Sequence, residues 1–425
     1  MLVRGGTVLT ASGPVRADVR IEGERIAELG PDLGEQPDEL DATGLHVFPG
    51  VVDAHVHFNE PGRADWEGLA TGSAAVAAGG GTCFLDMPLN AHPPTVDADA
   101  FALKAAAAAR ASVVDFALWG GLVPGNADRL AGLAAAGVVG FKAFMAPSGI
   151  EDFEAAGDAT LREGMARAAE LGLPVAVHAE APERLLAPAG TGWLDWARSR
   201  PVEAELDAIG RALGFAEETG CSLHVVHVSS ARGVGLVAAA RERGLDATCE
   251  TCPHYLVFAE DDLERLGALG KCAPPIRSAA ERAALHAELA AGRIELVASD
   301  HSPAPPALKQ GDDAFAAWGG ISGCQSLLPL LLTAVELAPA TVARLTATAP
   351  AERFRLPGKG RIEPGADADL ALVDLDATAE LRAGDLRYRH PHSPYVGMTL
   401  RGRIAATLLR GRPVGERLGR LVRPR

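Results

Sequence analysis

Two histidines, His55 and His57, are separated by a single residue at the end of an apolar segment. Side chains two positions apart on a strand point to the same face, so both imidazoles can bind one ion. The pair by itself is a weak signal, because two histidines held by core hydrogen bonds would look the same. Three more residues that end separate apolar segments indicate a metal centre: His178, His227 and Asp300. Imidazoles joined by one or two carboxylates are the ligands that zinc and similar ions favour.

Lys142 is the most informative single residue, because it lies among apolar neighbours in a chain with only five lysines. A buried ammonium is costly, and burial and nearby dications both lower its pKa toward the neutral amine. That amine could take up carbon dioxide and become N6-carboxylysine, whose two oxygens could bridge two metal ions. The alternative is a lysine that reaches solvent and pairs with a carboxylate. The other five candidate ligands favour the bridging carbamate.

The elements that must position these residues are short apolar segments, which alternate with Ala-rich helical ones between about residues 47 and 356. Helical character is clearest at 101–111, 160–171 and 279–291. Such alternation predicts a parallel βα sheet or barrel. Because the carboxyl ends of barrel strands converge on one rim, the candidate ligands are expected to meet there.

Both ends of the chain differ from this middle part, since they contain period-two segments interrupted by glycine. That pattern is typical of β-hairpins. We therefore expect residues 1–48 and 356–425 to form one small β domain together, beside a central domain at 49–355.

The composition excludes several classes of protein. The chain has 425 residues, 48% of them hydrophobic, as in a globular protein with a large core. A formal net charge of −15 argues against a nucleic-acid partner. The start lacks a secretory signal, and the longest apolar run, 326–338, is too short to span a bilayer.

The six cysteines lack disulfide-scaffold spacing, and the CxxC of Cys249 and Cys252 has no second pair. We expect reduced thiols, a cytoplasmic location and no membrane partner.

Six runs of residues resemble the cyclic amidohydrolases, and the resemblance extends through nearly the whole chain. The runs lie at 53–62 (DAHVHFNEPG), 140–145 (GFKAFM), 178–180 (HAE), 227–230 (HVSS), 252–255 (CPHY) and 299–303 (SDHSP). The resemblance implies an α/β fold, a TIM-like (β/α)8 barrel with a small β-sandwich formed by both chain termini. It also implies a binuclear metal centre bridged by carboxylated Lys142.

By position, the resemblance assigns the ligands as follows: His55, His57 and Asp300 to one ion, His178 and His227 to the other, and Lys142 to both. His224 competes with His227, but the family motif places the ligand directly before Val-Ser-Ser. His254 and His301 are expected to support the site without binding metal. The same ligands accept zinc, manganese, cobalt or iron, so we expect two divalent ions per subunit, zinc first among them.

Within the family, the segments at 58–63, 66–68, 86–90, 271–277 and 317–323 look like those of allantoinases, which open the ring of allantoin to give allantoate. Dihydroorotases usually carry an arginine where this chain has Asn59, and dihydropyrimidinases a tyrosine in the loop where it reads Phe144-Met145-Ala146. A hydantoinase, dihydropyrimidinase or dihydroorotase remains the alternative. A non-catalytic scaffold is a more remote one, because all six ligand positions are intact.

The resemblance also implies a mechanism. A metal-bridging hydroxide would attack the ring amide, since coordination lowers the pKa of water to about 7. Asp300 would take the water proton and pass it to the departing nitrogen. Substrate contacts are expected from Asn59, Asn90, Ala273, Gly320 and Ser322. Relatives are commonly homotetramers, so a homo-oligomer of that size is expected.

Overall fold

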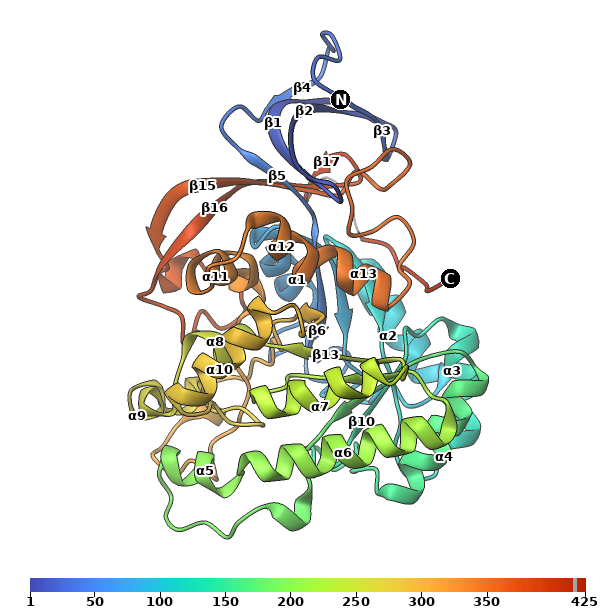
Figure 1. The fold of residues 1–425 in the computed structure, drawn as a ribbon, viewed down its shortest axis with the longest axis vertical. Coiled ribbons are helices and arrows are strands. Elements are labelled where there is room, and N and C mark those ends of the chain that lie inside the picture. The colour runs from blue at the N-terminus through green and yellow to red at the C-terminus, as the bar shows by residue number, and fades with distance from the viewer. Residues whose placement is uncertain (416–418) are drawn as a thin grey trace.

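The computed structural model describes residues 1–415 and 419–425. Strands from both ends of the chain form one sheet, at the top of Figure 1. Its strands are β1 Leu2–Thr10, β2 Gly13–Glu22, β3 Arg25–Gly30, β4 Glu39–Asp41, β5 His46–Pro49, β15 Leu370–Glu380, β16 Thr399–Leu409 and β17 Arg412–Pro413. They follow the order β17-β16-β15-β5-β1-β2-β3, with β4 on β1.

Strand β5 joins the two ends of the chain in this sheet. It pairs in parallel with β1, where Val8 lies opposite Val47, and antiparallel with β15, where Val47 lies opposite Leu372. Apolar side chains from both ends form one buried cluster, which includes Val19, Ile26, Val47, Leu370 and Leu408. Burial of these side chains holds the two terminal segments together.

Parallel strands fill the middle of the chain. They are β6 Val51–Val56, β7 Gly81–Asp86, β8 Asp115–Leu118, β9 Gly120–Gly121, β10 Phe141–Phe144, β11 Val175–His178, β12 Leu223–Val225, β13 Ala247–Thr251 and β14 Leu296–Val297. They pair in the orders β6-β7-β8 and β14-β13-β12-β11-β10-β9. Only Trp119 separates β8 from β9, and an isolated parallel bridge joins Val56 to His301, just after β14. The predicted alternation of parallel strands and helices is confirmed.

Helices lie between and outside these strands, and α4, α6 and α7 face the viewer in Figure 1. The α-helices are α1 Leu69–Ala78, α2 Ala98–Ala111, α3 Leu130–Ala136, α4 Asp158–Glu170, α5 Trp193–Ser199, α6 Val202–Thr219, α7 Ala231–Glu242, α8 Pro253–Val257, α9 Leu263–Leu266, α10 Ala279–Ala290, α11 Leu327–Ala334, α12 Pro339–Ala343 and α13 Ala349–Arg353. Single turns include η4 Gly267–Leu269 and η5 Pro306–Lys309. In α2, alanine favours the helix, and the Asp97 side chain caps it by accepting from the Ala100 amide at 2.9 Å.

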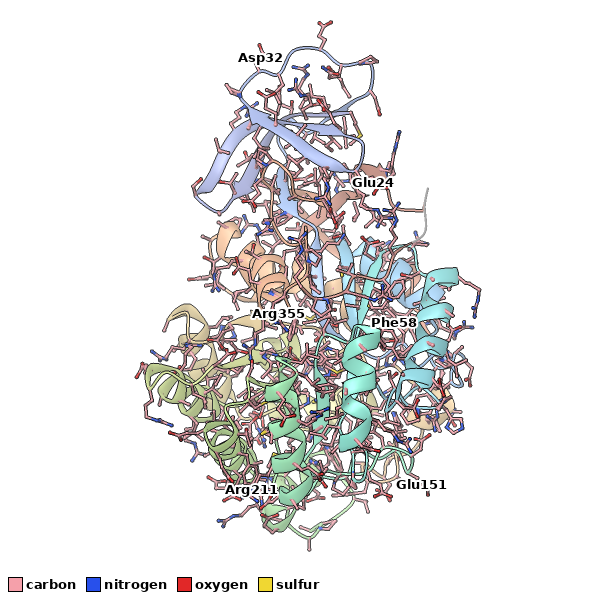
Figure 2. All side chains as sticks on the ribbon, turned by 90° about the vertical axis from the view of Figure 1, so that its right-hand side faces the viewer. Glu24, Asp32, Phe58, Glu151, Arg211 and Arg355 are labelled. Carbon is pink, nitrogen blue, oxygen red and sulfur yellow. The ribbon has the colours of Figure 1, made fainter. Side chains whose placement is uncertain are left out.

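The molecule is elongated in the direction that runs from the terminal sheet through the central strands. Figure 2 shows Asp32 at the outer tip of the terminal sheet and Arg211 and Glu151 at the opposite end.

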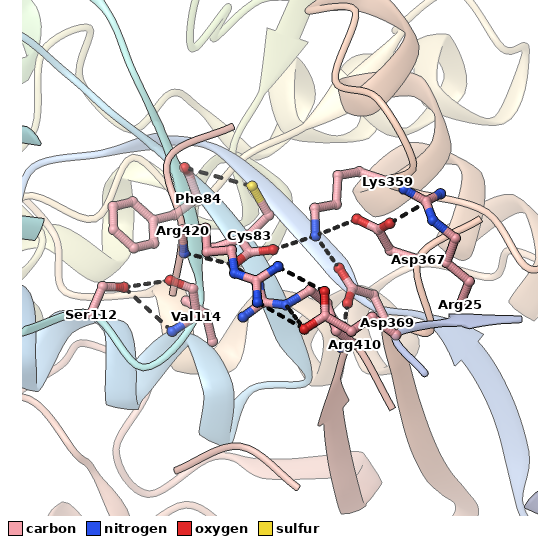
Figure 3. Close-up of polar contacts among 12 residues, drawn as sticks. Arg25, Cys83, Phe84, Ser112, Val114, Lys359, Asp367, Asp369, Arg410 and Arg420 are labelled. Carbon is pink, nitrogen blue, oxygen red and sulfur yellow. Dashed lines mark hydrogen bonds and ion pairs between the residues drawn. The ribbon is translucent and has the colours of Figure 1, made fainter. Parts of the chain in front are cut away.

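A buried network of charges connects the terminal sheet to the central strands (Figure 3). The Lys359 Nζ lies 2.5 Å from Asp115 Oδ2 and 2.7 Å from Asp369 Oδ2, and Arg410 also donates to Asp115. Burial alone would lower the pKa of Lys359, but Asp369 and Asp115 raise it above its usual value. Asp115, Asp367 and Asp369 come close enough together to hold a cation, but the Lys359 ammonium contacts all three.

Among the residues that the structure describes, no helix combines the length and apolar character needed to cross a membrane. The longest apolar run of the sequence falls largely in α11, whose leucines are buried. All six cysteines are buried free thiols, which includes the CxxC pair Cys249 and Cys252.

Candidate active site

Three of the predicted ligands converge on one point where strands of the central sheet end. His55 Nε2 and His57 Nε2 lie 3.3 Å and 3.4 Å from the same oxygen, Asp300 Oδ1. His55 belongs to β6, His57 follows that strand, and Asp300 follows β14. Two imidazole nitrogens and one carboxylate oxygen in this arrangement form a candidate site for a divalent metal ion.

The other ring nitrogen of each histidine is held by the protein. His55 Nδ1 lies 2.5 Å from Glu250 Oε1, and His57 Nδ1 lies 2.8 Å from the Leu89 carbonyl oxygen. Both partners accept, so each Nδ1 carries the proton and each Nε2 keeps its lone pair for a cation. The other Glu250 oxygen accepts from His224 Nε2 at 3.1 Å, so His224 supports Glu250.

His178 and His227 form a second pair beside the first. His178 Nδ1 lies 3.2 Å from His227 Nε2, while His178 Nε2 donates to Glu180 Oε2 at 2.7 Å. Arg200 holds Glu180 through two hydrogen bonds of 2.6 Å and 3.0 Å. Because the His178 proton is on Nε2, its Nδ1 presents a lone pair to His227. Two facing nitrogens of this kind fit a cation that both would bind.

Lys142 is fully buried in β10, and its Nζ has no hydrogen-bond partner among the described residues. Burial lowers the pKa of this amine to about 7, although Glu250 and Asp300 oppose the shift. Burial also lowers the pKa of both His178 and His227, and the charge of Lys142 contributes to each shift. Lys142 therefore lies within electrostatic reach of both groups of candidate ligands. An enclosed amine without acceptors fits a group that is modified before it is used.

Two of the candidate ligands have left-handed backbone conformations, which are uncommon outside glycine. The φ angles are 39° at His227 and 46° at Asp300, and both residues lie within three positions after the end of a strand. Strained backbone of this kind concentrates at functional sites, where the surrounding structure holds it in place. Here it turns each side chain toward the cavity at the strand ends.

A cavity of about 430 Å³ opens over these residues, and His55, His57, His178, His227 and Asp300 all line it. Apolar and aromatic side chains form much of the rest: Leu89, Phe144, Trp196, Phe315 and Trp318. A largely apolar pocket with a few convergent polar groups is typical of a small-molecule site.

Three of the five expected substrate contacts, Asn90, Ala273 and Gly320, line this cavity. Asn59 and Ser322 lie outside its lining. The Asn59 amide donates to the Pro303 carbonyl at 3.3 Å and accepts from Asn90 at the same distance, so it orients Asn90 from behind. The φ of 64° at Asn59 turns the backbone away from the strand direction. The spacing of residues in the sequence does not predict this turn.

Sequence reasoning missed the carboxylates that orient the histidines. Glu180 stands in the HAE run, two residues after His178. Glu250 lies between the two cysteines of the CxxC segment, and no role was predicted for it. A charged residue within the buried strand β13 was the available signal. His301 was expected to support the site, and its Nδ1 accepts from the Gly323 amide at 3.1 Å.

Comparison with known proteins identifies the family. The sequence pattern of the amidohydrolase family matches residues 46–414 of this chain. An allantoinase of Rubrobacter xylanophilus is 56% identical over 100% of this chain and 97% of its own, and one of Deinococcus radiodurans is 50% identical over 100% and 99%. Among solved structures, an L-hydantoinase (dihydropyrimidinase) from Arthrobacter aurescens has a TM-score of 0.95 and 34% identity, and covers 99% of both chains.

Proposed function

Because the chain belongs to the amidohydrolase family, we propose that it hydrolyses a cyclic amide, opening the hydantoin ring of allantoin to give allantoate. The observation that carries the chemistry is the convergence of His55 and His57 on Asp300 Oδ1 in the lining of the cavity. The choice of allantoin rests on the full-length similarity to allantoinases. The neutral Asn59, in the place where dihydroorotases usually carry an arginine, also favours an uncharged ring.

The residues present fit two divalent ions, for which zinc is the first candidate and manganese, cobalt and iron are alternatives. His55, His57 and Asp300 would hold one, His178 and His227 the other, and a carbamate on Lys142 would be shared. When bound, such ions supply an activated water and polarise a carbonyl. The unpartnered Lys142 Nζ supports the carbamate, because carboxylation would replace a buried ammonium with a ligand.

Asp300 is the residue that we propose as the proton carrier. Burial alone would raise the pKa of Asp300, but His55, His57 and His227 lower it below its usual value. The carboxylate is therefore ionised at neutral pH and can accept a proton only as the reaction develops. It takes the proton that the attacking water releases on bonding to the ring carbonyl carbon, and passes it to the ring nitrogen as the C–N bond breaks, so that the nitrogen leaves as a neutral group. The cavity walls would orient the ring, and Asn90, Ala273 and Gly320 lie in the lining where they can contact it.

We extend the proposal to the architecture and assembly. The parallel strand order and the bridge between Val56 and His301 support a TIM-like (β/α)8 barrel at 49–355, with a β-sandwich from 1–48 and 356–425. Six free thiols support a cytoplasmic location, since reducing compartments keep cysteines unpaired. The expected homotetramer remains a proposal that light scattering of the purified protein would test.

An assay on three rings tests the function. Purified, metal-loaded protein is given allantoin, dihydroorotate and dihydrouracil, with metal content measured on the same sample. We expect ring opening of allantoin, two metal ions per chain, and loss of turnover in Asp300→Asn. Activity confined to dihydrouracil would instead favour the hydantoinase or dihydropyrimidinase alternative, which the solved relatives make the second candidate.

A further inference from the structure

One side of the cavity is a continuous stretch of loop, residues 315–320, all six of which line it. We name this stretch the 315–320 wall. It contains no helix or strand, so its backbone groups cannot be satisfied by regular structure. Whatever holds these groups sets the position of the wall.

Lys309, at the end of η5, donates to this wall from behind. Its Nζ lies 2.7 Å from the Gly320 carbonyl oxygen, 3.2 Å from that of Ala268 and 3.4 Å from that of Trp318. An ammonium has three donors, and here three carbonyls surround it. Ala268 lies in η4, shortly before the second lining segment, 271–273. One side chain therefore ties together two separate parts of the cavity lining.

Lys271 strengthens the same connection. Its Nζ donates to the Ala317 carbonyl at 2.5 Å and lies 4.1 Å from the centre of the Trp196 ring. Its own carbonyl accepts from the Gly320 amide at 2.8 Å. The Gly320 N–H is thus engaged by Lys271 and its carbonyl by Lys309. Glycine is required there, because its φ is 107° and an added Cβ would meet the Ser302 carbonyl oxygen at 2.1 Å.

The geometry points to Lys309 as a positioning residue for the ring-opening reaction: by bonding three carbonyls it fixes the 315–320 wall against the 268–273 segment. It thereby sets the width of the cavity and determines which ring substituents are admitted. This inference rests on the proposed function, since the wall faces a substrate only if the cavity takes a cyclic amide.

The test compares Lys309→Met with wild type and with a control, Leu308→Ala, whose side chain is 39% exposed. Amide hydrogen exchange is followed across the chain, metal content is measured, and kcat and KM are determined for allantoin and for unsubstituted hydantoin. We expect faster exchange at Trp318 and Gly320 in Lys309→Met, with metal content unchanged. Loss of these hydrogen bonds predicts a rise of about ten-fold in KM for allantoin, with kcat changing far less. Preference for allantoin over hydantoin should fall, and the control should match wild type.

Several outcomes would overturn the inference. Unchanged exchange in the wall of an active Lys309→Met enzyme would do so, as would faster exchange spread over the whole chain with loss of metal. A Lys309→Met enzyme that keeps the wild-type preference for allantoin over hydantoin would also overturn it, because the wall would then not determine which ring substituents are admitted. Wild-type inactivity on every ring would instead defeat the proposed function, a result that the exchange measurement keeps separate.

Discussion

His55 Nδ1 and Glu250 Oε1 lie 2.5 Å apart, and both side chains are 1% exposed. Burial alone would raise the pKa of Glu250, but His55 and His224 lower it to about 2, so the carboxylate is charged at neutral pH. It fixes the His55 proton on Nδ1 and turns Nε2 toward Asp300. Glu250 thus decides which His55 nitrogen faces a cation.

The substitution Glu250→Gln keeps the shape of this side chain and removes its charge. We expect the protein to fold and to bind its metal about 10- to 100-fold more weakly, as is usual when a partner of a metal-binding histidine is changed. Competition with a chelator, followed by metal analysis, measures the change. The exposed Glu242→Gln provides the matched control. Equal affinity in the two variants would contradict the assigned role of Glu250.

Lys142→Ala removes the proposed bridging ligand. We expect loss of both metal ions and of turnover, because no other described residue can replace two bridging oxygens. A short-chain carboxylic acid supplied in solution should partly restore both, since it occupies the space of the missing group. Metal content and turnover equal to those of wild type would rule out the carbamate.

The contact of Glu180 with Arg200 predicts a dependence of stability on pH. Burial alone would raise the pKa of Glu180, but Arg200 and His178 lower it from 4.5 to about 2. A lowered pKa stabilises the fold above the unfolded value of 4.5, and this stabilisation is lost as the pH falls toward about 2. In metal-free protein, Arg200→Gln should therefore lose stability at a higher pH than wild type does. Urea unfolding at successive pH values measures this, and a difference that is constant across the acid range would contradict it.

Lys359→Met should destabilise the connection between the terminal sheet and the central strands. It leaves Asp115 and Asp369 buried near Arg410 with one cation fewer, and breaking a buried pair costs about 3–5 kcal/mol. The control, Arg361→Met, removes a cation that is 45% exposed, which contributes about 0–1 kcal/mol. Equilibrium unfolding in urea compares the two. A Lys359→Met protein as stable as the control would show that the network does not hold the two parts together.

The candidate ligands were predictable because parallel strands bring their carboxyl ends to one edge. His178 ends β11 and Asp300 follows β14, and the apolar segment before each was visible in the sequence. Glu250 was not predicted as a partner of His55, since that contact depends on which strands are neighbours. Local periodicity gives a strand and its faces, but not its partner.

In the terminal sheet and the loops, too, local patterns were predictable and tertiary contacts were not. Hairpin patterns predicted strands at both ends, yet nothing local specified that β5 would pair with both β1 and β15. In the loops, the substrate contact expected of Asn59 stays a prediction, and the hydrogen bond of Asn59 to Asn90 was not predicted, because the backbone turns at this left-handed residue. Side-chain direction in such segments follows from tertiary contacts and not from spacing.

All five lysines lie among the described residues, and none extends freely into solvent: Lys104, Lys142, Lys271 and Lys359 are buried, and Lys309 is half-buried among carbonyls. Even the Met1 amino group donates to the Ile21 carbonyl at 3.1 Å. Reagents that acylate primary amines, including those used to attach enzymes to solid supports, would therefore find few accessible amines on the intact fold. Their rate of reaction would report instead on how often the interior opens, and immobilisation would be better directed to the plentiful outer carboxylates.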